Sequence, residues 1–549
     1  MTSKAEQLKI DSKYLRGDLA ESLQNPVTGA VSADSHNLIK FHGIYEQDDR
    51  DCRDRRAEKK LEKLYSFMIR LRIPGGRISS KQWLGIDDIA NHNSTKVIKV
   101  TTRQTVQLHG VVKAKLKPTV AWFDKYGLDS IAACGDVNRN VISSSAIPKS
   151  KGADEVYDYA KKIAEHLLPK TNAYNEIWLD GEKVSPEDEE EPIYGQTYLP
   201  RKFKVALATP PDNDVDVYAH DIGLIAIINK GDLQGFNVVV GGGLGMTHGN
   251  ENTYPRKGDI IGYVTKDKLI DTVEKIVTVQ RDFGNREDRK LARLKYTIDK
   301  FGLDWFTGEL EKRLNFKLEK AKDFKFSKRQ DCYNWDQDYS GKYHYTLFIE
   351  NGRIYDDKNY KIKTALLEIA KSGKANFRFT NNQNIVISDV LEKDKKLIDK
   401  ILADYKINNE NISNLRINAL ACVALPTCPQ ALAEGQRYMP DLISKIEPLL
   451  TKYRLDNEQI TIRMTGCPNG CARPYLAEIG LVGKSAGKYN LYLAGSNVGE
   501  RLNRLYKEDL EEDDILNELN NLFKLYQSNK KANETFGDFT LREVKFNQQ

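Results

Sequence analysis

The chain of 549 residues is too long for one hydrophobic core, so several domains are expected. Hydrophobic residues make up 40% and charged residues 30%, which is typical of a globular protein. The net charge of +6 permits anionic ligands but gives no reason to expect nucleic acid as a partner. The longest apolar runs, such as "GLIAII", are far shorter than a membrane span, so no membrane partner is expected.

The N-terminus carries no apolar signal segment. The start, "MTSKAEQLKIDSKYLRG", lacks the hydrophobic centre of a secretion signal, and we expect a cytoplasmic protein. Seven cysteines in so long a chain do not form a disulfide scaffold. In a reducing compartment, clustered cysteines indicate metal or redox chemistry.

Residues 1–60 have a polar, irregular pattern and are expected to form an N-terminal arm. The charge run "EQDDRDCRDRR" within them, and the acidic stretch "PEDEEEP" at 186–192, are expected to be solvated surface. Near the other end, "EDLEEDDILNELNNLFKLYQ" is the clearer of two amphipathic helical patterns in the tail.

The most informative feature is an internal repeat. "GGRISSKQWLGIDDIAN…VIKVTTRQTVQL", from Gly75, resembles "NGRIYDDKNYKIKTALLEIAK…FRFTNNQNIVI", from Asn351. Each copy predicts a Gly-Arg-Ile turn, a helix with apolar periodicity, and then strand residues around Thr-x-x-Gln.

Three further matches follow in the same order. "NVISSSAIP" (140–148) aligns with "NALACVALP" (418–426), and "KFKVALATPPDND" aligns with "QITIRMTGCPNGC", with Thr209 facing Thr465. "DIGLIAI…FNVVVGGGL" aligns with "EIGLVGK…YNLYLAGSN". This long period is not that of a solenoid. It indicates one ancestral α/β unit, duplicated and fused, and predicts a pseudo-twofold molecule.

Four cysteines lie in two pairs in the second copy. The pairs are Cys422 and Cys428 in "CVALPTC", and Cys467 and Cys471 in "CPNGC". Their expected first-copy counterparts, Ser144 and Pro211, have no thiol, so the repeat does not need these cysteines to fold. The three solitary cysteines, expected to be small buried hydrophobic residues, are Cys52, Cys134 and Cys332.

The spacing of the pairs favours an iron–sulfur cluster over zinc. Structural zinc sites favour C-x2-C pairs, whereas the pairs here are C-x5-C and C-x3-C. Pro429 follows Cys428, so we expect this cysteine at a helix N-terminus, where the helix dipole stabilises a thiolate. Gly470 permits the tight curvature that lets both sulfurs of "CPNGC" face one group.

C-x5-C followed by C-P-N-G-C resembles the pattern of the sirohaem-dependent sulfite and nitrite reductases. The resemblance covers nearly the whole chain and is strongest to the assimilatory sulfite-reducing branch. It also rests on "LIKFHGIYEQDDRD", "RIPGG", "TTRQTVQLHG", "DVNRNV", "GQTYLPRKFK", "VVGGGLG" and "FGDFTLR". It implies an α+β fold of pseudo-twofold duplicated α/β units, in three domains with the cofactors at their interface.

The domain boundaries implied by the repeat and the resemblance follow the N-terminal arm. We expect a paired ferredoxin-like repeat domain at 61–130 with 340–410, an anion- and sirohaem-binding domain at 131–339, and a [4Fe–4S]- and sirohaem-binding domain at 411–549.

The resemblance implies two cofactors, sirohaem and a [4Fe–4S] cluster. The cluster ligands would be Cys422, Cys428, Cys467 and Cys471. Cys471 would also be the axial ligand of the sirohaem iron. The implied reaction is the six-electron reduction of sulfite to sulfide, for which a cluster wired through a shared thiolate can resupply the iron.

The resemblance also implies a basic pocket, because sirohaem carries carboxylates and sulfite is an oxyanion. The residues facing the substrate would be Arg70, Arg139, Lys202 and Lys204. The residues meeting the cofactor would be Arg103, Gln107, His109, Asn469 and Cys471. Lys202 and Lys204 alternate by two and should share one face of a strand. These lysines lie in the first copy and the cysteines in the second. We infer that after the duplication one copy came to bind the anion and supply protons, and the other to bind the metal and supply electrons.

Some of these residues have simpler interpretations. A histidine such as His109 in an alternating strand is more often a satisfied core residue. "VVGGGLG" lacks a full G-x-G-x-x-G and is a weak dinucleotide motif, so its glycines are expected to admit the sirohaem rim.

Two alternative functions remain open. A nitrite reductase of the same family would use the same cofactors, although such enzymes typically have asparagine where Lys204 stands. An electron carrier or zinc-stapled binding protein would need no basic pocket. No flavin or NADPH region is recognised, so electrons should come from another protein. The resemblance implies a flavoprotein reductase subunit, with ferredoxin as the alternative.

Overall fold

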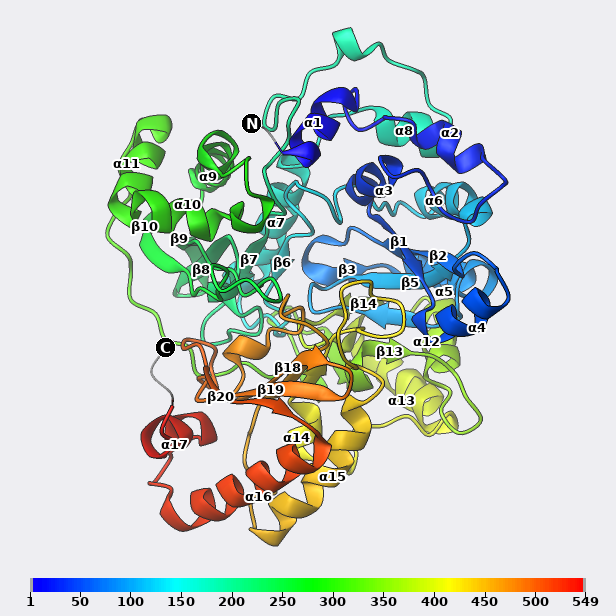
Figure 1. The fold of residues 1–549 in the computed structure, drawn as a ribbon. Coiled ribbons are helices and arrows are strands. Elements are labelled where there is room, and N and C mark those ends of the chain that lie inside the picture. The colour runs from blue at the N-terminus through cyan, green and yellow to red at the C-terminus, as the bar shows by residue number, and fades with distance from the viewer. Residues whose placement is uncertain (1–2, 547–549) are drawn as a thin grey trace.

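The structure, a computed structural model, describes residues 3–546. Within these residues the strands form four five-stranded sheets. Figure 1 shows three bodies: sheets 1 and 2 at the right, sheet 3 at the upper left, and sheet 4 with the C-terminal helices below.

Sheets 1 and 2 come from the two copies of the first repeated segment, one sheet mainly from each copy. Sheet 1 has the order β1 (Ile44–Asp48), β2 (Tyr65–Arg70), β5 (Val106–Val111), β4 (Ile98–Val100), β13 (Arg353–Ile354). Sheet 2 has the order β11 (Asn334–Gln337), β12 (Tyr343–Leu347), β15 (Ile385–Val390), β14 (Asn376–Phe379), β3 (Arg77–Ile78). Each sheet takes its last strand from the other copy, so the Gly-Arg-Ile turns lock the two copies together.

Sheets 3 and 4 come from the later repeated segments and share one topology. Sheet 3 contains β6 (Ile142–Ser143), β7 (Val205–Ala208), β8 (Ile222–Asn229), β9 (Asp232–Val240) and β10 (Asp259–Thr265). Sheet 4 contains β16 (Ala419–Ala421), β17 (Ile462–Thr465), β18 (Ile479–Ser485), β19 (Lys488–Leu493) and β20 (Arg504–Leu510). In both, the first two pairings are parallel and the next two antiparallel, as a duplication requires.

Matching hydrogen bonds fix the correspondence of the copies. Ser144 N donates to Leu207 O (2.8 Å) as Cys422 N does to Met464 O (3.2 Å), so Ser144 corresponds to Cys422 as expected. Leu207 and Met464 are then equivalent, and Ala208 rather than Thr209 corresponds to Thr465. The predicted alignment of this strand is wrong by one residue. The first-copy counterpart of Cys467 is therefore Pro210, not Pro211.

The one-residue error matters because it would reverse the two faces of the strand. A strand pattern has a period of two, and a shift by one residue exchanges its two faces. In the corrected register Phe203 corresponds to Ile460, and both are core residues that are 1% exposed. The shared threonine letters suggested a register that would have aligned Lys204 with a core position.

The helices cover the sheets. α5 (Ser80–Asn93) packs on α12 (Ile362–Ser372), α7 (Lys151–His166) and α9 (Leu269–Phe283) pack on sheet 3, and α15 (Met439–Lys452) packs on α16 (Glu512–Asn529) beside sheet 4. The predicted tail helix is α16, which buries residues at helical spacing from Ile515 to Tyr526. The other helices are α1 (Lys4–Asp11), α2 (Leu19–Gln24), α3 (Ser35–Leu38), α4 (Arg53–Glu58), α6 (Leu116–Lys125), α8 (Ala173–Trp178), α10 (Leu294–Phe301), α11 (Leu303–Leu314), α13 (Lys395–Asp404), α14 (Asn414–Ile417) and α17 (Phe536–Glu543).

Two large hydrophobic cores hold this arrangement. One runs continuously through sheets 1, 2 and 3, and the other joins sheet 4 to α15, α16 and α17. A small cluster that includes Leu244, Tyr475 and Leu476 connects the loop after β9 with the loop after β17. In the part of the chain that the structure describes, no helix has the length and apolarity needed to cross a membrane.

Several surface expectations differ from the structure. β1 lies within residues 1–60 but is a strand of sheet 1. In the acidic stretch, Glu189 and Glu191 are buried, because they accept hydrogen bonds from the amides of Asn172 (2.5 Å) and Lys170 (2.9 Å). Cys332, expected to be buried, is exposed.

Candidate active site

The four paired cysteines lie at one edge of sheet 4. Cys422 directly follows β16, and Cys467 follows β17 after one residue. These strands are parallel neighbours, with Ala421 paired to Met464, so their carboxyl ends meet at the same edge. Loops at this edge of parallel strands commonly carry functional groups.

The thiols are close enough to affect one another. Burial raises the pKa of Cys467 to about 12, and the Cys471 thiol adds to the rise. Burial and then Cys471 likewise hold the pKa of Cys422 well above its ordinary value. Burial and Cys471 also raise the pKa of Cys428. Four neighbouring thiolates repel one another, so all four cysteines can be deprotonated together only around a positively charged group.

Backbone amides surround these sulfurs. Gly466 N donates to Cys422 Sγ (3.4 Å), and the amides of Gln430 and Ala431 favour the thiolate of Cys428. The prediction of a helix starting after Cys428 is wrong, because α15 begins only at Met439. The intervening loop folds back onto the second cysteine loop, since Ala433 N donates to Gly466 O (3.0 Å). Cys428 therefore has amide donors without a helix.

The N-terminal charge run contacts the same loop. Arg50 Nη1 donates to Ala431 O (2.6 Å) and Cys428 O (3.4 Å), and its positive charge partly offsets the rise in the pKa of Cys428. Asp51 forms an ion pair with Arg437 (2.6 Å). The prediction that this run is only solvated surface is wrong for these residues. The charged composition of this run did not predict that it contacts the loop after Cys428.

The donor set fits an iron–sulfur cluster in its chemistry. Four thiols with amide donors are the set that such clusters use. Within residues 3–546, no group of three or more His, Cys, Asp or Glu side chains is placed to hold a single metal ion.

A group of arginine and lysine side chains in the first copy has no ion-pair partner in the described part of the chain. Among the described residues, no ion pair is found for Arg70, Arg103, Arg139, Arg201, Lys202 or Lys204. Burial lowers the pKa of Lys202 to about 7, helped by Arg201 and Arg139. Burial and then Lys202 hold the pKa of Lys204 well below its ordinary value. Crowded, unpaired cations of this kind fit a ligand with several negative charges.

Both lysines lie near Cys471, whose negative charge partly opposes the lowering of their pKa values. They precede β7, and Phe203 between them is buried, so they lie on the face opposite the core as predicted. Thr102 Oγ1 donates to Cys471 O (3.1 Å), which places the turn before Arg103 against the second cysteine loop. The two lysines of the first copy thus lie near Cys471 of the second copy.

Arg70, Gln107 and His109 form one chain of side chains. With the Gln107 amide oriented so that its oxygen faces Arg70, that oxygen accepts from Arg70 Nε (3.0 Å) and its nitrogen donates to His109 Nε2 (3.2 Å). Burial lowers the pKa of His109 to about 3, helped by Lys99 and Arg70, so the ring is neutral at physiological pH. Arg70 Nη1 also donates to Cys134 Sγ (3.0 Å), a contact that the sequence did not predict.

Arg139 and Arg103 are held by backbone carbonyls. Arg139 donates from Nε and Nη2 to Gly135 O (3.1 and 3.0 Å). Arg103 donates to Asn140 O and to His220 Nδ1 (3.3 Å). Arg103 Nε is buried and has no hydrogen-bond partner among the described residues. An orphaned guanidinium donor is what a cofactor carboxylate would satisfy, so Arg103 fits an anionic cofactor.

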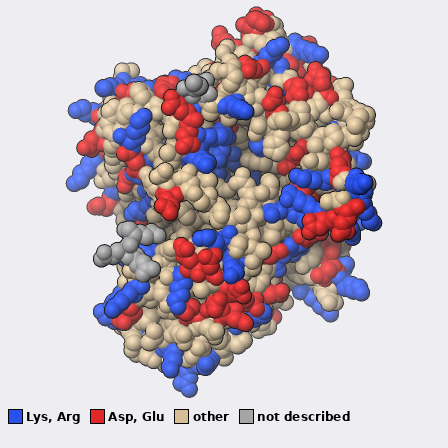
Figure 2. Space-filling model, in the orientation of Figure 1, with Lys and Arg blue, Asp and Glu red and all other residues tan. Residues whose placement is uncertain are grey.

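The glycine loop after β9 packs on "CPNGC". Met246 N donates to Pro468 O (2.9 Å), and a Cβ at Gly245 would lie 3.2 Å from Asn469 O. Asn469 Nδ2 donates to Gln430 Oε1 (2.6 Å), so this residue lies among the cysteine loops. No helix follows the glycines as it does in a dinucleotide site. Figure 2 shows a hollow near the middle of one face, with Lys and Arg side chains in its depth.

Two protein-family models match the chain. "Nitrite/Sulfite reductase ferredoxin-like half domain" matches residues 59–124 and 336–405, which supports the duplication of sheets 1 and 2. "Nitrite and sulphite reductase 4Fe-4S domain" matches residues 158–318. That stretch contains no cysteine, so the match falls on the first copy.

Curated relatives match over the full length. Proteins named "Sulfite reductase [NADPH] hemoprotein beta-component" are 56% identical in Leptospira biflexa over 98% of both chains, and 53% identical in Staphylococcus carnosus over 98% of this chain and 95% of that one. The solved structure of the NirA protein of Mycobacterium tuberculosis has a TM-score of 0.80 at 21% identity and covers 99% of this chain and 97% of that one. This last likeness supports the fold alone.

Proposed function

We propose, from the premise that this chain belongs to the nitrite and sulfite reductase family, that it reduces sulfite to sulfide with six electrons. Within the family, the full-length relatives at 50–56% identity are named as the haemoprotein component of NADPH sulfite reductase. We therefore assign the chain to the same component.

One observation carries the proposal. Lys202 and Lys204, which no described carboxylate neutralises, lie near the Cys471 thiol. An electron carrier would need the cysteines but not the lysines, and an anion-binding protein would need the lysines but not the cysteines. An oxyanion reductase needs both at one place.

The cysteines would hold the cofactors. Cys422, Cys428, Cys467 and Cys471 would bind the [4Fe–4S] cluster, and Cys471 would also bind the sirohaem iron. When bound, these cofactors would supply stored electrons and an iron able to bind the sulfur of sulfite. Arg103, Gln107, His109 and Asn469 would hold sirohaem carboxylates, with neutral His109 acting only as a hydrogen-bonding group.

The cations would bind the substrate oxygens and supply protons. Arg70 donates a hydrogen bond to Cys134 Sγ, and Arg139 donates two to Gly135 O. These bonds hold the two guanidinium groups in place, which suits oxyanion binding. Each oxygen that leaves as water takes two protons. Lys202, whose pKa burial lowers to about 7, is protonated in part at neutral pH and can donate one of them. Arg201, which the sequence did not single out, adjoins Lys202 and adds positive charge.

The division of labour among domains follows from this assignment. We propose that 131–339 binds the anion and one side of sirohaem, that 411–549 binds the cluster, and that 61–130 with 340–410 and the arm 1–60 hold these two in place. The relatives' names specify NADPH, and we propose that a flavoprotein subunit oxidises it and passes the electrons to this chain. We also propose a cytoplasmic location.

The experiment is a turnover assay with both candidate substrates. Protein loaded with sirohaem is supplied with reduced methyl viologen, and sulfite and nitrite consumption are compared. A kcat/KM at least tenfold higher for sulfite supports the proposal. A preference for nitrite would make the chain a nitrite reductase, and a protein without haem absorption bands or turnover would be neither.

A further inference from the structure

A small cavity lies where the pseudo-twofold symmetry places the counterpart of the candidate active site. Four of its lining residues are Asn382, Ile417, Asn418 and Thr461. Thr461 corresponds to Lys204, because Ile479 N donates to Thr461 O (3.0 Å) as Ile222 N does to Lys204 O (3.1 Å). In the repeat, the other three correspond to Arg103, Arg139 and Asn140 in that order.

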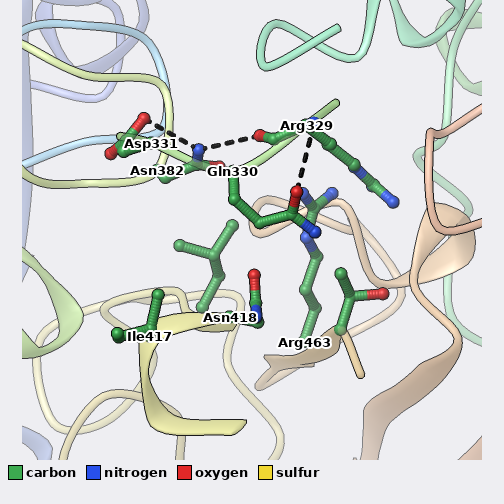
Figure 3. A pocket seen from close by; sticks show the side chains of 9 residues that line it. Arg329, Gln330, Asp331, Asn382, Ile417, Asn418 and Arg463 are labelled. Atoms are coloured by element: carbon green, nitrogen blue, oxygen red, sulfur yellow. Dashed lines mark hydrogen bonds between the residues drawn. The ribbon is translucent and has the colours of Figure 1, made fainter. Parts of the chain in front are cut away.

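The second copy has lost the basic groups at these positions. Arginine, arginine and lysine in the first copy are replaced by asparagine, isoleucine and threonine. The space is instead filled by Arg329, Gln330 and Asp331 from the segment that connects the two copies (Figure 3). The remaining cavity leaves about 10 Å³ for the centre of a water-sized sphere. That is room for about one such particle.

The cavity nevertheless retains a cationic side chain with an unpartnered donor. Arg463 lines it and is 2% exposed, and Arg463 Nε has no hydrogen-bond partner among the described residues. Both hydrogen bonds of Arg463 leave from Nη1, to Asp216 Oδ2 (2.6 Å) and Arg473 O (3.5 Å). Figure 3 shows its guanidinium group directed toward the amide of Gln330. Gln330 Oε1 accepts from Arg329 N (3.3 Å), which turns the NH2 group toward the cavity.

The carboxylates near the cavity are already engaged by cations or by hydroxyl and amide donors. Asp216 serves three guanidinium groups, those of Arg329, Arg463 and Arg473, at 2.6–2.7 Å. The carboxylate of Asp331 accepts from Thr380, Asn384 and Asn382 at 2.6, 2.8 and 3.1 Å. Arg463 Nε is a buried donor without a partner among the described residues, which is destabilising unless a ligand supplies the acceptor.

We propose that this cavity binds one small monatomic anion of the chloride class between Arg463 and Gln330. The anion accepts hydrogen bonds from Arg463 and Gln330. It thereby holds the connecting segment in the second-copy counterpart of the candidate active site. A sulfite-sized oxyanion does not fit, because the remaining volume admits only one particle of about the size of water. The proposal is independent of the reaction at the candidate active site.

Crystals of the holoprotein grown in bromide test the proposal directly. Bromide replaces chloride and gives an anomalous diffraction peak at its absorption edge. The expected result is a peak within hydrogen-bonding distance of both Arg463 and Gln330. Density without an anomalous signal there identifies the occupant as water and overturns the proposal.

Thermal unfolding tests it in solution. We expect the Tm of the holoprotein to be roughly 2–4 °C higher in chloride than in gluconate at equal ionic strength, because the anion binds only the folded chain. Gln330→Glu places a carboxylate opposite Arg463 and should abolish that difference. The matched control, Gln337→Glu, adds the same charge at an exposed position and should keep it. A chloride effect that persists in Gln330→Glu overturns the proposal, and if that variant does not fold, the bromide result decides alone.

Discussion

Lys99 and Arg378 occupy equivalent places in the two copies. Lys99 Nζ donates to Asn351 O, and Arg378 Nε donates to Gly75 O (3.1 Å), each reaching the Gly-Arg-Ile turn of the other copy. Arg378 continues to Ser143 Oγ (3.1 Å) and to Ser144 O. Because Ser144 corresponds to Cys422, Lys99 should lie against a cysteine that we propose as a cluster ligand. The Cys422 thiolate does raise the pKa of Lys99, although burial lowers it to about 7 overall.

The Lys99→Met variant should lower the midpoint potential of the cluster. A buried cation beside a thiolate ligand stabilises the added electron, so its removal should make reduction harder by on the order of tens of millivolts. Redox titration followed by electron paramagnetic resonance measures this shift. Lys99→Arg, which restores the charge, should return most of the potential. Equal shifts in both variants would show that packing, not charge, matters at this position.

The sequence predicted the architecture because the repeat carries it twice. Two Gly-Arg-Ile turns, two helices and two strand sets recur in order, and each recurrence is independent support for the same fold. The strand exchange through β3 and β13 could not be predicted, because pairing partners distant in sequence leave no local pattern. The register error between β7 and β17 arose because both strands are buried on both faces, so no polar–apolar alternation marks their register and one matching threonine misled the alignment.

Tertiary contacts account for what the sequence missed in the site. Pro429 is favourable at a helix start, yet the amides that follow Cys428 bond to the other cysteine loop instead. Arg50 sits in a run of mixed charges that resembles a solvated surface, and only the fold brings it to Ala431 O. The family pattern identified the cysteines and lysines of the site. Local sequence preferences predicted neither the contact between the two cysteine loops nor the contact of Arg50.

The Cys471→Ser variant should lose the cluster together with the electronic coupling of the two centres. Serine oxygen is a poor replacement for a thiolate, and Cys471 is the cysteine that influences all three others. Iron and sulfide content and the visible spectrum are the measurements. Cys332→Ser, which changes an exposed solitary cysteine, is the control and should leave both unchanged. A Cys471→Ser protein with wild-type iron content and turnover would falsify the shared-ligand role.

The Asp216→Asn variant should destabilise the fold by about 3–5 kcal/mol, because it leaves buried guanidinium groups without their counter-charge. Arg329, Arg463 and Arg473 all pair with this carboxylate. Asp216 has a left-handed backbone (φ 53°), which asparagine also adopts, so backbone strain should add little. Denaturant unfolding measures the loss. Asp158→Asn, at an exposed position, is the control and should change stability by less than about 0.5 kcal/mol.

The stability of the cofactor-free protein should depend on pH through Lys202. Burial lowers its pKa from 10.5 to about 7, so between these values the unfolded chain holds a proton that the folded chain does not. Stability must therefore rise as the pH increases through this window. The Lys202→Met variant should show a smaller rise in Tm between pH 7 and 10 than the wild type, whereas Lys374→Met at an exposed position should match the wild type. Identical profiles for all three would mean that Lys202 keeps its ordinary pKa.

The Lys204→Asn variant should reduce sulfite turnover far more than nitrite turnover. Deprotonated sulfite is a dianion and nitrite a monoanion, so a second lysine beside Lys202 adds more attraction for sulfite. At an effective dielectric of about 20, a charge pair in contact gains roughly 4 kcal/mol before desolvation costs. Even a net gain of about 1.4 kcal/mol corresponds to tenfold in binding. Lysine also brings a proton, which asparagine cannot donate as each oxygen leaves.

The position of Lys204 makes this comparison informative. Its pKa is lowered first by burial and then by Lys202 and Arg103, so its ammonium group is crowded by cations that an anion would relieve. We expect kcat/KM for sulfite to fall at least tenfold in Lys204→Asn while that for nitrite stays within a few-fold or rises. Both substrates are assayed with the same viologen donor, and Lys325→Asn, at an exposed position, should change neither. Equal losses for the two substrates would mean that Lys204 supports the pocket without discriminating between the anions.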